Sequence, residues 1–243
     1  MTPEIEAIFL DVGNTLRIVI EDPKLQQQAK DELMALVKAT ETPEVFFEKV
    51  EKRWKAYRNL SKKSLLEASE LELWTQWLLP DYPIGIVAPN ISRLTRLWRD
   101  RDGKRVPRHD ARETIIELHR RGYKLGIIAN TITETEIPDW MLSDGVTGYF
   151  KTVILSSKVR IRKPDPAIYL LAARVMGGAP EKCAYLGDNP IRDVEGTRAA
   201  GYGMMILFEE PATIAKEPQT GDLKPDYTIK ETKQLLDIFP PRQ

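Results

Sequence analysis

The hydrophobic pattern of the chain changes character twice, and these changes constrain the fold more than any other feature. Residues 5–10 form a short apolar run typical of a buried strand, and residues 17–20 form a second extended piece. From Gln26 to about Arg101 the apolar residues recur every three or four positions, the spacing of amphipathic helices, with breaks at prolines. A helical segment therefore interrupts a core that contains strands.

Beyond Pro107 the sequence alternates between helical and strand-like segments. Strands are predicted at 124–129, 152–155, 183–187, 204–208 and 227–229. Helices are predicted at 110–120, 137–142, 165–176, 191–200 and 231–239, and the proline-containing segment 209–225 is predicted to be a surface loop. Alternation of this kind is typical of βαβ units, so we predict an α/β fold with a parallel sheet and helices on both faces.

The order of these segments also predicts two domains. We expect residues 1–20 and 105–243 to form the α/β core and residues 21–104 to form a helical insert. Four of the five tryptophans lie in the insert and are expected to build a small core of its own: Trp54, Trp74, Trp77 and Trp98. The mixed-charge run 96–108 is expected to be a solvated connector.

Charge and hydropathy restrict the classes of partner. The chain has 36 basic and 36 acidic residues, so no overall field favours nucleic acid or an anionic membrane surface. No apolar run approaches the roughly 20 residues that cross a bilayer, and the first residues are acidic rather than basic. We expect a cytoplasmic protein with a small-molecule partner; the oligomeric state is left open.

Polar residues follow several of the predicted strands. Asp11 ends the first strand, Asn130 and Thr131 follow the strand 124–129, and Asp188 follows the strand 183–187. The carboxyl ends of parallel strands share one edge of the sheet, where open α/β folds bind their ligands. Each residue alone has an ordinary structural explanation, such as a turn, but together they predict a site.

Two further residues complete this prediction. Lys163 precedes Asp165 and Pro166, which suit the start of a helix, and Asp193 falls in the first turn of the helix after Asp188. Carboxylates that converge at one edge repel each other unless a cation lies between them. Hard oxygen ligands suit Mg²⁺, and Lys163 supplies a second positive charge near a nucleophilic carboxylate and a phosphoryl group.

The order of these motifs resembles that of the haloacid dehalogenase superfamily, in its phosphatase-like branch with a helical cap inserted after the first motif. The resemblance implies a Rossmann-like core and a hydrolase in which Asp11 becomes an aspartyl-phosphate. It implies that Asp11, Asp188 and the carbonyl group of Gly13 hold Mg²⁺, with support from Asp193. It also implies that Lys163 neutralises charge and that Asn130 lies beside the phosphate-binding hydroxyl.

Two positions depart from the family pattern. Gly13 stands where family phosphatases usually carry an acid that protonates the leaving group, and Ala129 stands where they carry a hydroxyl, for which Thr131 is a substitute if its turn permits. A general acid/base contributes roughly 10²–10⁴ to the rate, so slow turnover is expected. Arg17, Arg58, Lys62 and Lys63 are our candidates for substrate contact.

Three functions follow from this pattern. The first is a Mg²⁺-dependent hydrolase of small phosphorylated metabolites, acting best on acyl or aryl phosphates, whose leaving groups need no proton. The second is cleavage of a carbon–phosphorus or carbon–halogen bond, since superfamily enzymes of those classes also lack the acid. The third is a catalytically impaired member that binds a phosphorylated ligand or a protein.

Overall fold

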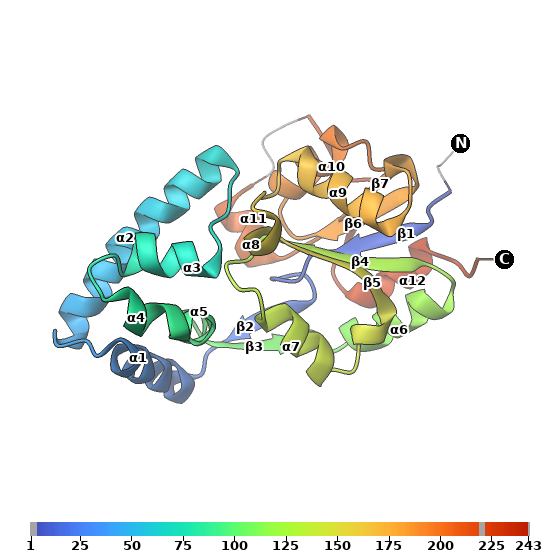
Figure 1. The fold of residues 1–243 in the computed structure, drawn as a ribbon. Coiled ribbons are helices and arrows are strands. Elements are labelled where there is room, and N and C mark those ends of the chain that lie inside the picture. Colours follow the sequence, from blue (N-terminus) through green and yellow to red (C-terminus); the bar gives the residue numbers. More distant parts are fainter. Residues whose placement is uncertain (1–3, 219–221, 243) are drawn as a thin grey trace.

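The computed structural model describes residues 4–218 and 222–242, and the main element is a parallel sheet of six strands (Figure 1). Its spatial order is β5-β4-β1-β6-β7-β8. The strands are β1 (Ala7–Leu10), β4 (Lys124–Ala129), β5 (Phe150–Leu155), β6 (Cys183–Gly187), β7 (Met204–Phe208) and β8 (Tyr227–Ile229). The α/β Rossmann-like fold is confirmed.

β1 lies at the centre of the sheet because all four of its residues are apolar and buried. Leu10 pairs with Ile127 of β4 on one side and with Leu186 of β6 on the other. The three strands therefore end within two residues of one another, and the residues that follow them share one edge.

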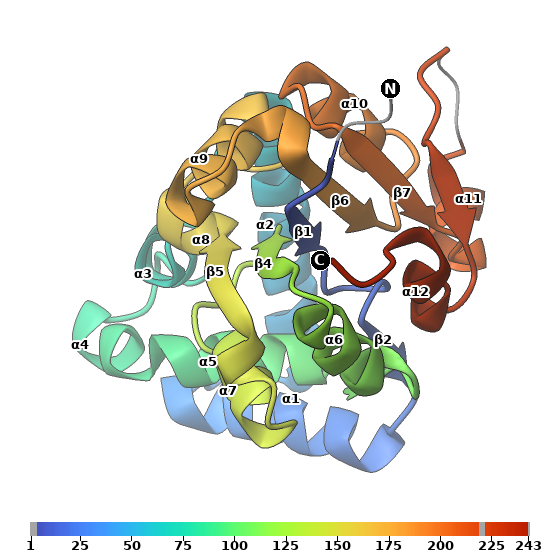
Figure 2. The ribbon, with the colours of Figure 1, turned by 90° about the vertical axis from the view of Figure 1, so that its right-hand side faces the viewer.

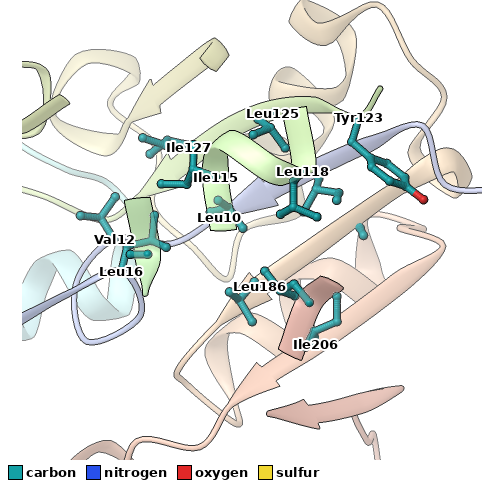
Figure 3. Close-up of a cluster of buried hydrophobic side chains, with 14 of the residues drawn as sticks. Leu10, Val12, Leu16, Ile115, Leu118, Tyr123, Leu125, Ile127, Leu186 and Ile206 are labelled. Atoms are coloured by element: carbon teal, nitrogen blue, oxygen red, sulfur yellow. The ribbon is translucent and has the colours of Figure 1, made fainter. Parts of the chain in front are cut away.

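Helices cover both faces of the sheet (Figures 1 and 2). One face packs against α6 (Ala111–Arg120), α7 (Glu136–Ser143) and α12 (Leu235–Ile238), with Leu10, Ile127 and Leu186 in the shared apolar cluster (Figure 3). The other face packs against α9 (Pro166–Met176) and α10 (Arg192–Ala199). The sheet is thus buried on both sides, which explains its nearly continuous apolar strands.

The segment between β2 and β3 is helical, as the periodicity predicts. It contains α1 (Pro23–Val37), α2 (Pro43–Ser64), α3 (Glu70–Glu72), the π-helix η1 (Leu73–Leu78), α4 (Ile84–Val87), the 3₁₀ helix η2 (Ala88–Asn90) and α5 (Ile91–Asp100). Trp74 and Trp98 are buried and meet edge to face, with ring centroids 6.2 Å apart. Trp54 and Trp77 pack beside this cluster, so the prediction that the tryptophans build a core of the insert is confirmed. The domain limits at 20/21 and 104/105 stay a prediction.

Two segments that were expected to be irregular contain regular elements. Residues 104–107, expected to be a connector, form β3 (Lys104–Pro107), which pairs antiparallel with β2 (Arg17–Ile20) in a separate two-stranded sheet. The segment 209–225, expected to be a loop, contains α11 (Pro211–Lys216). Arginine at 105 and the prolines in 209–225 obscured both elements, since charge and proline ordinarily indicate solvated loops.

The remaining elements are short. They are α8 (Ser156–Val159) and the 3₁₀ helices η3 (Thr147–Tyr149), η4 (Pro180–Lys182) and η5 (Thr232–Gln234). Over residues 4–218 and 222–242, every helix is too short or too polar to cross a membrane.

Candidate active site

Three carboxylates meet at the carboxyl edge of the sheet. Asp11 follows β1, Asp188 follows β6, and Asp193 lies in the first turn of α10. One carboxylate oxygen from each lies within 4.8 Å of the others, and all three residues are buried. The sequence predicts this convergence, because β1 and β6 are paired neighbours.

Lys163 joins two of these carboxylates. Its Nζ atom lies 3.2 Å from Asp11 Oδ1 and 3.1 Å from Asp193 Oδ1, and its side chain is fully buried. The same Nζ donates to the hydroxyl oxygen of Tyr185 at 2.5 Å, and that hydroxyl donates to the carbonyl oxygen of Ile128. All of these contacts fix the ammonium group beside Asp11.

The main chain at Lys163 is held by Asn130. The Asn130 side chain donates to the carbonyl oxygen of Lys163 at 2.9 Å and accepts from its N–H at 2.8 Å. Asp165 then caps α9 by accepting from the N–H of Ala167 at 2.9 Å, as expected from the sequence. Asn130 therefore positions Lys163, and a substrate contact from its side chain stays a prediction.

Arg192 also reaches the carboxylates, and the sequence analysis missed it. Its Nη2 atom lies 2.9 Å from Asp193 Oδ2, 3.3 Å from Asp11 Oδ2 and 3.3 Å from Asp188 Oδ1. Burial alone lowers the pKa of Arg192, but Asp193 and Asp11 outweigh it and raise the pKa well above its usual range. Its place at the start of α10, four residues after Asp188, was the available signal.

The carboxylates differ in their surroundings. Burial and the nearby charge of Asp11 raise the pKa of Asp188 to about 6, although Arg192 opposes the shift. Burial acts to raise the pKa of Asp193 as well, but Arg192 and Lys163 outweigh it and lower this pKa. Asp193 is therefore better compensated by nearby positive charge than Asp188 is.

Asp188 is covered by α11, which the sequence predicts as loop. Thr213 on this helix donates its hydroxyl to Asp188 Oδ2 at 2.6 Å, and Asn14 donates to Thr213 Oγ1 at 3.2 Å. A segment distant in the sequence thus closes the site next to the turn after Asp11.

Gly187 is required by the packing of Asp193. A Cβ atom added at Gly187 would lie 2.4 Å from Asp193 Oδ2, closer than any real contact. Gly13 is the opposite case, because it is exposed and nothing lies within 4 Å of an added Cβ. The site therefore has room for an acid at position 13 and lacks one.

A cavity of about 190 Å³ opens beside Gly13. Three of the predicted substrate contacts line it: Arg17, Asn130 and Thr131. Arg17 pairs with Glu136 at 3.0 Å and donates to the carbonyl oxygen of Arg105 at 3.1 Å. The Thr131 hydroxyl accepts from the N–H of Thr133 at 3.2 Å.

A second cavity of about 240 Å³ lies between the insert and the carboxylates. Arg58 and Lys62 of α2 line it, as does Arg192. Lys63, the third candidate in this loop, is not part of the lining. Two of the three insert residues proposed from sequence thus border the site.

The three carboxylates fit a divalent cation. Carboxylate oxygens are the ligands that Mg²⁺ prefers, and Asp11, Asp188 and Asp193 supply them within the span of one ion. The carbonyl group of Gly13, expected as a further ligand, adjoins Asp11 in the turn. Arg192 is the feature that this donor set does not explain.

Comparison with known proteins agrees with this geometry. Residues 5–201 match the family model of haloacid dehalogenase-like hydrolases. The chain belongs to this family. The resemblance inferred from the sequence motifs is confirmed.

Curated members of the family include phosphatases. The chain is 29% identical over 134 residues to a glyceraldehyde 3-phosphate phosphatase of Methanopyrus kandleri. The match covers 54% of this chain and 56% of that protein. The chain is 35% identical over 137 residues to a phosphoserine phosphatase of Thermus thermophilus, covering 56% and 53%. The matches thus span about half the length of these relatives.

A solved structure supports the fold over the whole chain. The 2-haloacid dehalogenase of Pseudomonas syringae pv. Tomato DC3000 superposes with a TM-score of 0.66 at 19% identity, covering 96% of this chain and 97% of that one. At this identity the likeness shows the fold alone.

Proposed function

We propose that this protein is a Mg²⁺-dependent hydrolase of small phosphorylated metabolites that acts through an aspartyl-phosphate on Asp11. One observation carries the proposal: the buried Asp11 carboxylate lies beside the fully buried Lys163 ammonium and beside two further carboxylates. The phosphatase names of the similar relatives support it. Residues 1–20 and 105–243 would form the catalytic core, with 21–104 as its cap.

The proposed chemistry has two steps. A carboxylate oxygen of Asp11 attacks phosphorus while the bond from phosphorus to the leaving oxygen breaks, and water then releases inorganic phosphate from the aspartyl-phosphate. Lys163, whose Nζ atom lies 3.2 Å from Asp11 Oδ1, faces the developing negative charge. Mg²⁺, held by Asp11, Asp188 and the Gly13 carbonyl with support from Asp193, would supply further charge neutralisation when bound.

Gly13 determines which leaving groups suit the site. No side chain at this position can protonate the leaving oxygen or activate water. Acyl and aryl phosphates release anions that are stable without a proton, so we propose these as the better substrates. The non-reacting end would lie in the cavity beside Gly13, near Arg17 and Thr131.

A substrate panel tests this function. We expect the purified protein with Mg²⁺ to hydrolyse acetyl phosphate and an aryl phosphate faster than alkyl phosphates. Asp11→Asn should abolish the activity, whereas Asp31→Asn, an exposed control in α1, should retain it. Activity that survives in Asp11→Asn would refute the covalent mechanism.

The same panel distinguishes the other functions. Release of phosphate from phosphonoacetaldehyde, or halide from a haloacid, would favour carbon–phosphorus or carbon–halogen cleavage. Binding of phosphate without turnover of any substrate would favour the impaired member.

A further inference from the structure

Arg192 occupies the place among the carboxylates where a cation is expected. Its Nη2 atom contacts Asp11, Asp188 and Asp193, whereas the ammonium group of Lys163 contacts only two of them. A guanidinium nitrogen of this type carries two hydrogens and cannot make three good hydrogen bonds at once. Nη2 therefore acts toward the three anions mainly as a positive charge.

The distances show which of these contacts are weak. Charge-assisted N–H···O bonds are typically about 2.7–2.9 Å long. The contact with Asp193 falls in this range at 2.9 Å, whereas the contacts with Asp11 and Asp188 are both 3.3 Å. Arg192 is thus anchored to Asp193 and only loosely joined to the other two carboxylates.

The two cations also differ in freedom to move. The Lys163 side chain is fully buried, whereas 27% of the Arg192 side chain is exposed. Arg192 borders the cavity of about 240 Å³ that also contains Glu217. A guanidinium that leaves Asp11 and Asp188 therefore has space and an acceptor carboxylate on the same side.

We propose that Arg192 is a resident counter-cation that competes with Mg²⁺ for the Asp11, Asp188 and Asp193 carboxylates. Mg²⁺ binds only as the guanidinium moves into the cavity beside Glu217, and this displacement weakens the affinity of the protein for the metal. The inference rests on the proposed Mg²⁺ site but not on turnover.

Metal binding by the full chain tests the competition directly. Calorimetric titration of the chelator-treated protein with MgCl₂ compares the wild type with Arg192→Gln, Arg198→Gln and Asp188→Asn. Arg198 is a matched control, because it lies on the same helix, has the same 27% side-chain exposure and pairs with Asp226 at 3.0 Å. We expect Arg192→Gln to bind Mg²⁺ about tenfold tighter than wild type, the factor set by one lost charge-assisted hydrogen bond.

The outcomes separate the two proposals. If Arg192→Gln binds Mg²⁺ no tighter than wild type or Arg198→Gln while Asp188→Asn loses binding, the competition is refuted and the metal site stands. If Asp188→Asn binds Mg²⁺ as wild type does, the metal site itself fails.

A second measurement uses the unmodified chain and does not depend on the folding of a variant. Phenylglyoxal labelling followed by mass spectrometry reports the reactivity of each arginine. Saturating Mg²⁺ should raise the reactivity of Arg192 severalfold and leave that of Arg198 unchanged. Unchanged or reduced labelling of Arg192 would overturn the displacement.

Discussion

Two buried ionic clusters, one containing Asp11 and the other containing Arg17, have net charges of opposite sign. In the first, three carboxylates share the positive charges of Lys163 and Arg192. In the second, a single buried carboxylate, Glu136, pairs with three arginines: Arg17, Arg99 and Arg105.

The difference in net charge predicts that the two clusters attract ions of opposite sign. The carboxylate-rich cluster has an excess of negative charge and attracts a cation, whereas the arginine-rich cluster has an excess of positive charge and attracts an anion. Burial and the nearby charge of Arg99 lower the pKa of Arg105 to about 10, which reflects this crowding of cations. The cavity beside Gly13 is lined by Arg17, Arg99 and Arg105, which favours an anionic ligand there.

Of the substitutions that test the difference between the two clusters, Lys163→Met should have the largest effect on stability and activity. It leaves Asp11 and Asp193 without their buried ammonium, and removal of one partner from a buried pair costs about 3–5 kcal/mol of unfolding free energy. Phosphatase activity should fall with it. Denaturant titration and initial rates measure both. The control Lys182→Met, at an exposed ion pair with Glu6, should unfold as wild type does.

Gly13→Asp should sharpen the comparison by restoring a general acid. Nothing lies within 4 Å of an added Cβ at this position, so the side chain fits. We expect hydrolysis of alkyl phosphates to rise by about 10² or more, with a smaller gain on acetyl phosphate. Gly13→Asn is the control of similar size, and an equal gain in that variant would show that acid catalysis is not the cause.

Gly187→Ala should disturb the carboxylate-rich cluster by adding a Cβ atom to the main chain beside Asp193. The new Cβ atom would lie 2.4 Å from Asp193 Oδ2, so the carboxylate that anchors Lys163 and Arg192 must move. Overpacking of this kind costs about 1–3 kcal/mol. Thermal unfolding measures the loss, and Gly148→Ala, where an added Cβ meets nothing within 4 Å, should unfold as wild type does.

Substitution of Glu136 should produce the smallest effect of the four changes. This effect should appear in the pH dependence of the unfolding free energy. Burial acts to raise the pKa of Glu136, but Arg99 and Arg105 outweigh it and lower the pKa below its usual 4.5. Its contribution to folding is therefore present above about pH 4.5 and is lost as the pH falls through the folded-state pKa. Glu136→Gln should therefore flatten the acid limb of the stability curve.

Measurement of unfolding free energy from pH 7 to pH 3 tests this expectation. Glu113→Gln, at an exposed pair with Arg112, should keep the wild-type curve. A curve for Glu136→Gln as steep as that of wild type would assign the acid limb to other carboxylates.

Much of the fold could be predicted from periodicity. The strands 124–129, 183–187 and 204–208 match β4, β6 and β7 to the residue, because strands buried on both faces are continuous apolar runs with polar ends. The proximity of Asp11 to Asp188 follows from the same pattern, since both residues directly follow neighbouring strands.

Other parts of the site depend on tertiary structure. Arg192 was missed because only the fold determines whether a long side chain on a helix points to solvent or back across the strand ends. Thr213 was missed because its helix is short and follows Pro211, which local sequence preferences indicate as loop. For Thr213 the partner, Asp188, lies 25 residues away, in a segment that local pattern cannot connect to it.

Trapping of phosphate on Asp11 is the most direct test of the central claim, a covalent carrier without an acid partner. The wild type and Gly13→Asp are quenched during turnover of acetyl phosphate with Mg²⁺, and the peptide that contains Asp11 is analysed by mass spectrometry. We predict that phospho-Asp11 accumulates in the wild type, because Gly13 cannot activate water, and is depleted in Gly13→Asp. Steady turnover with no phosphate on Asp11 in either protein would contradict the account.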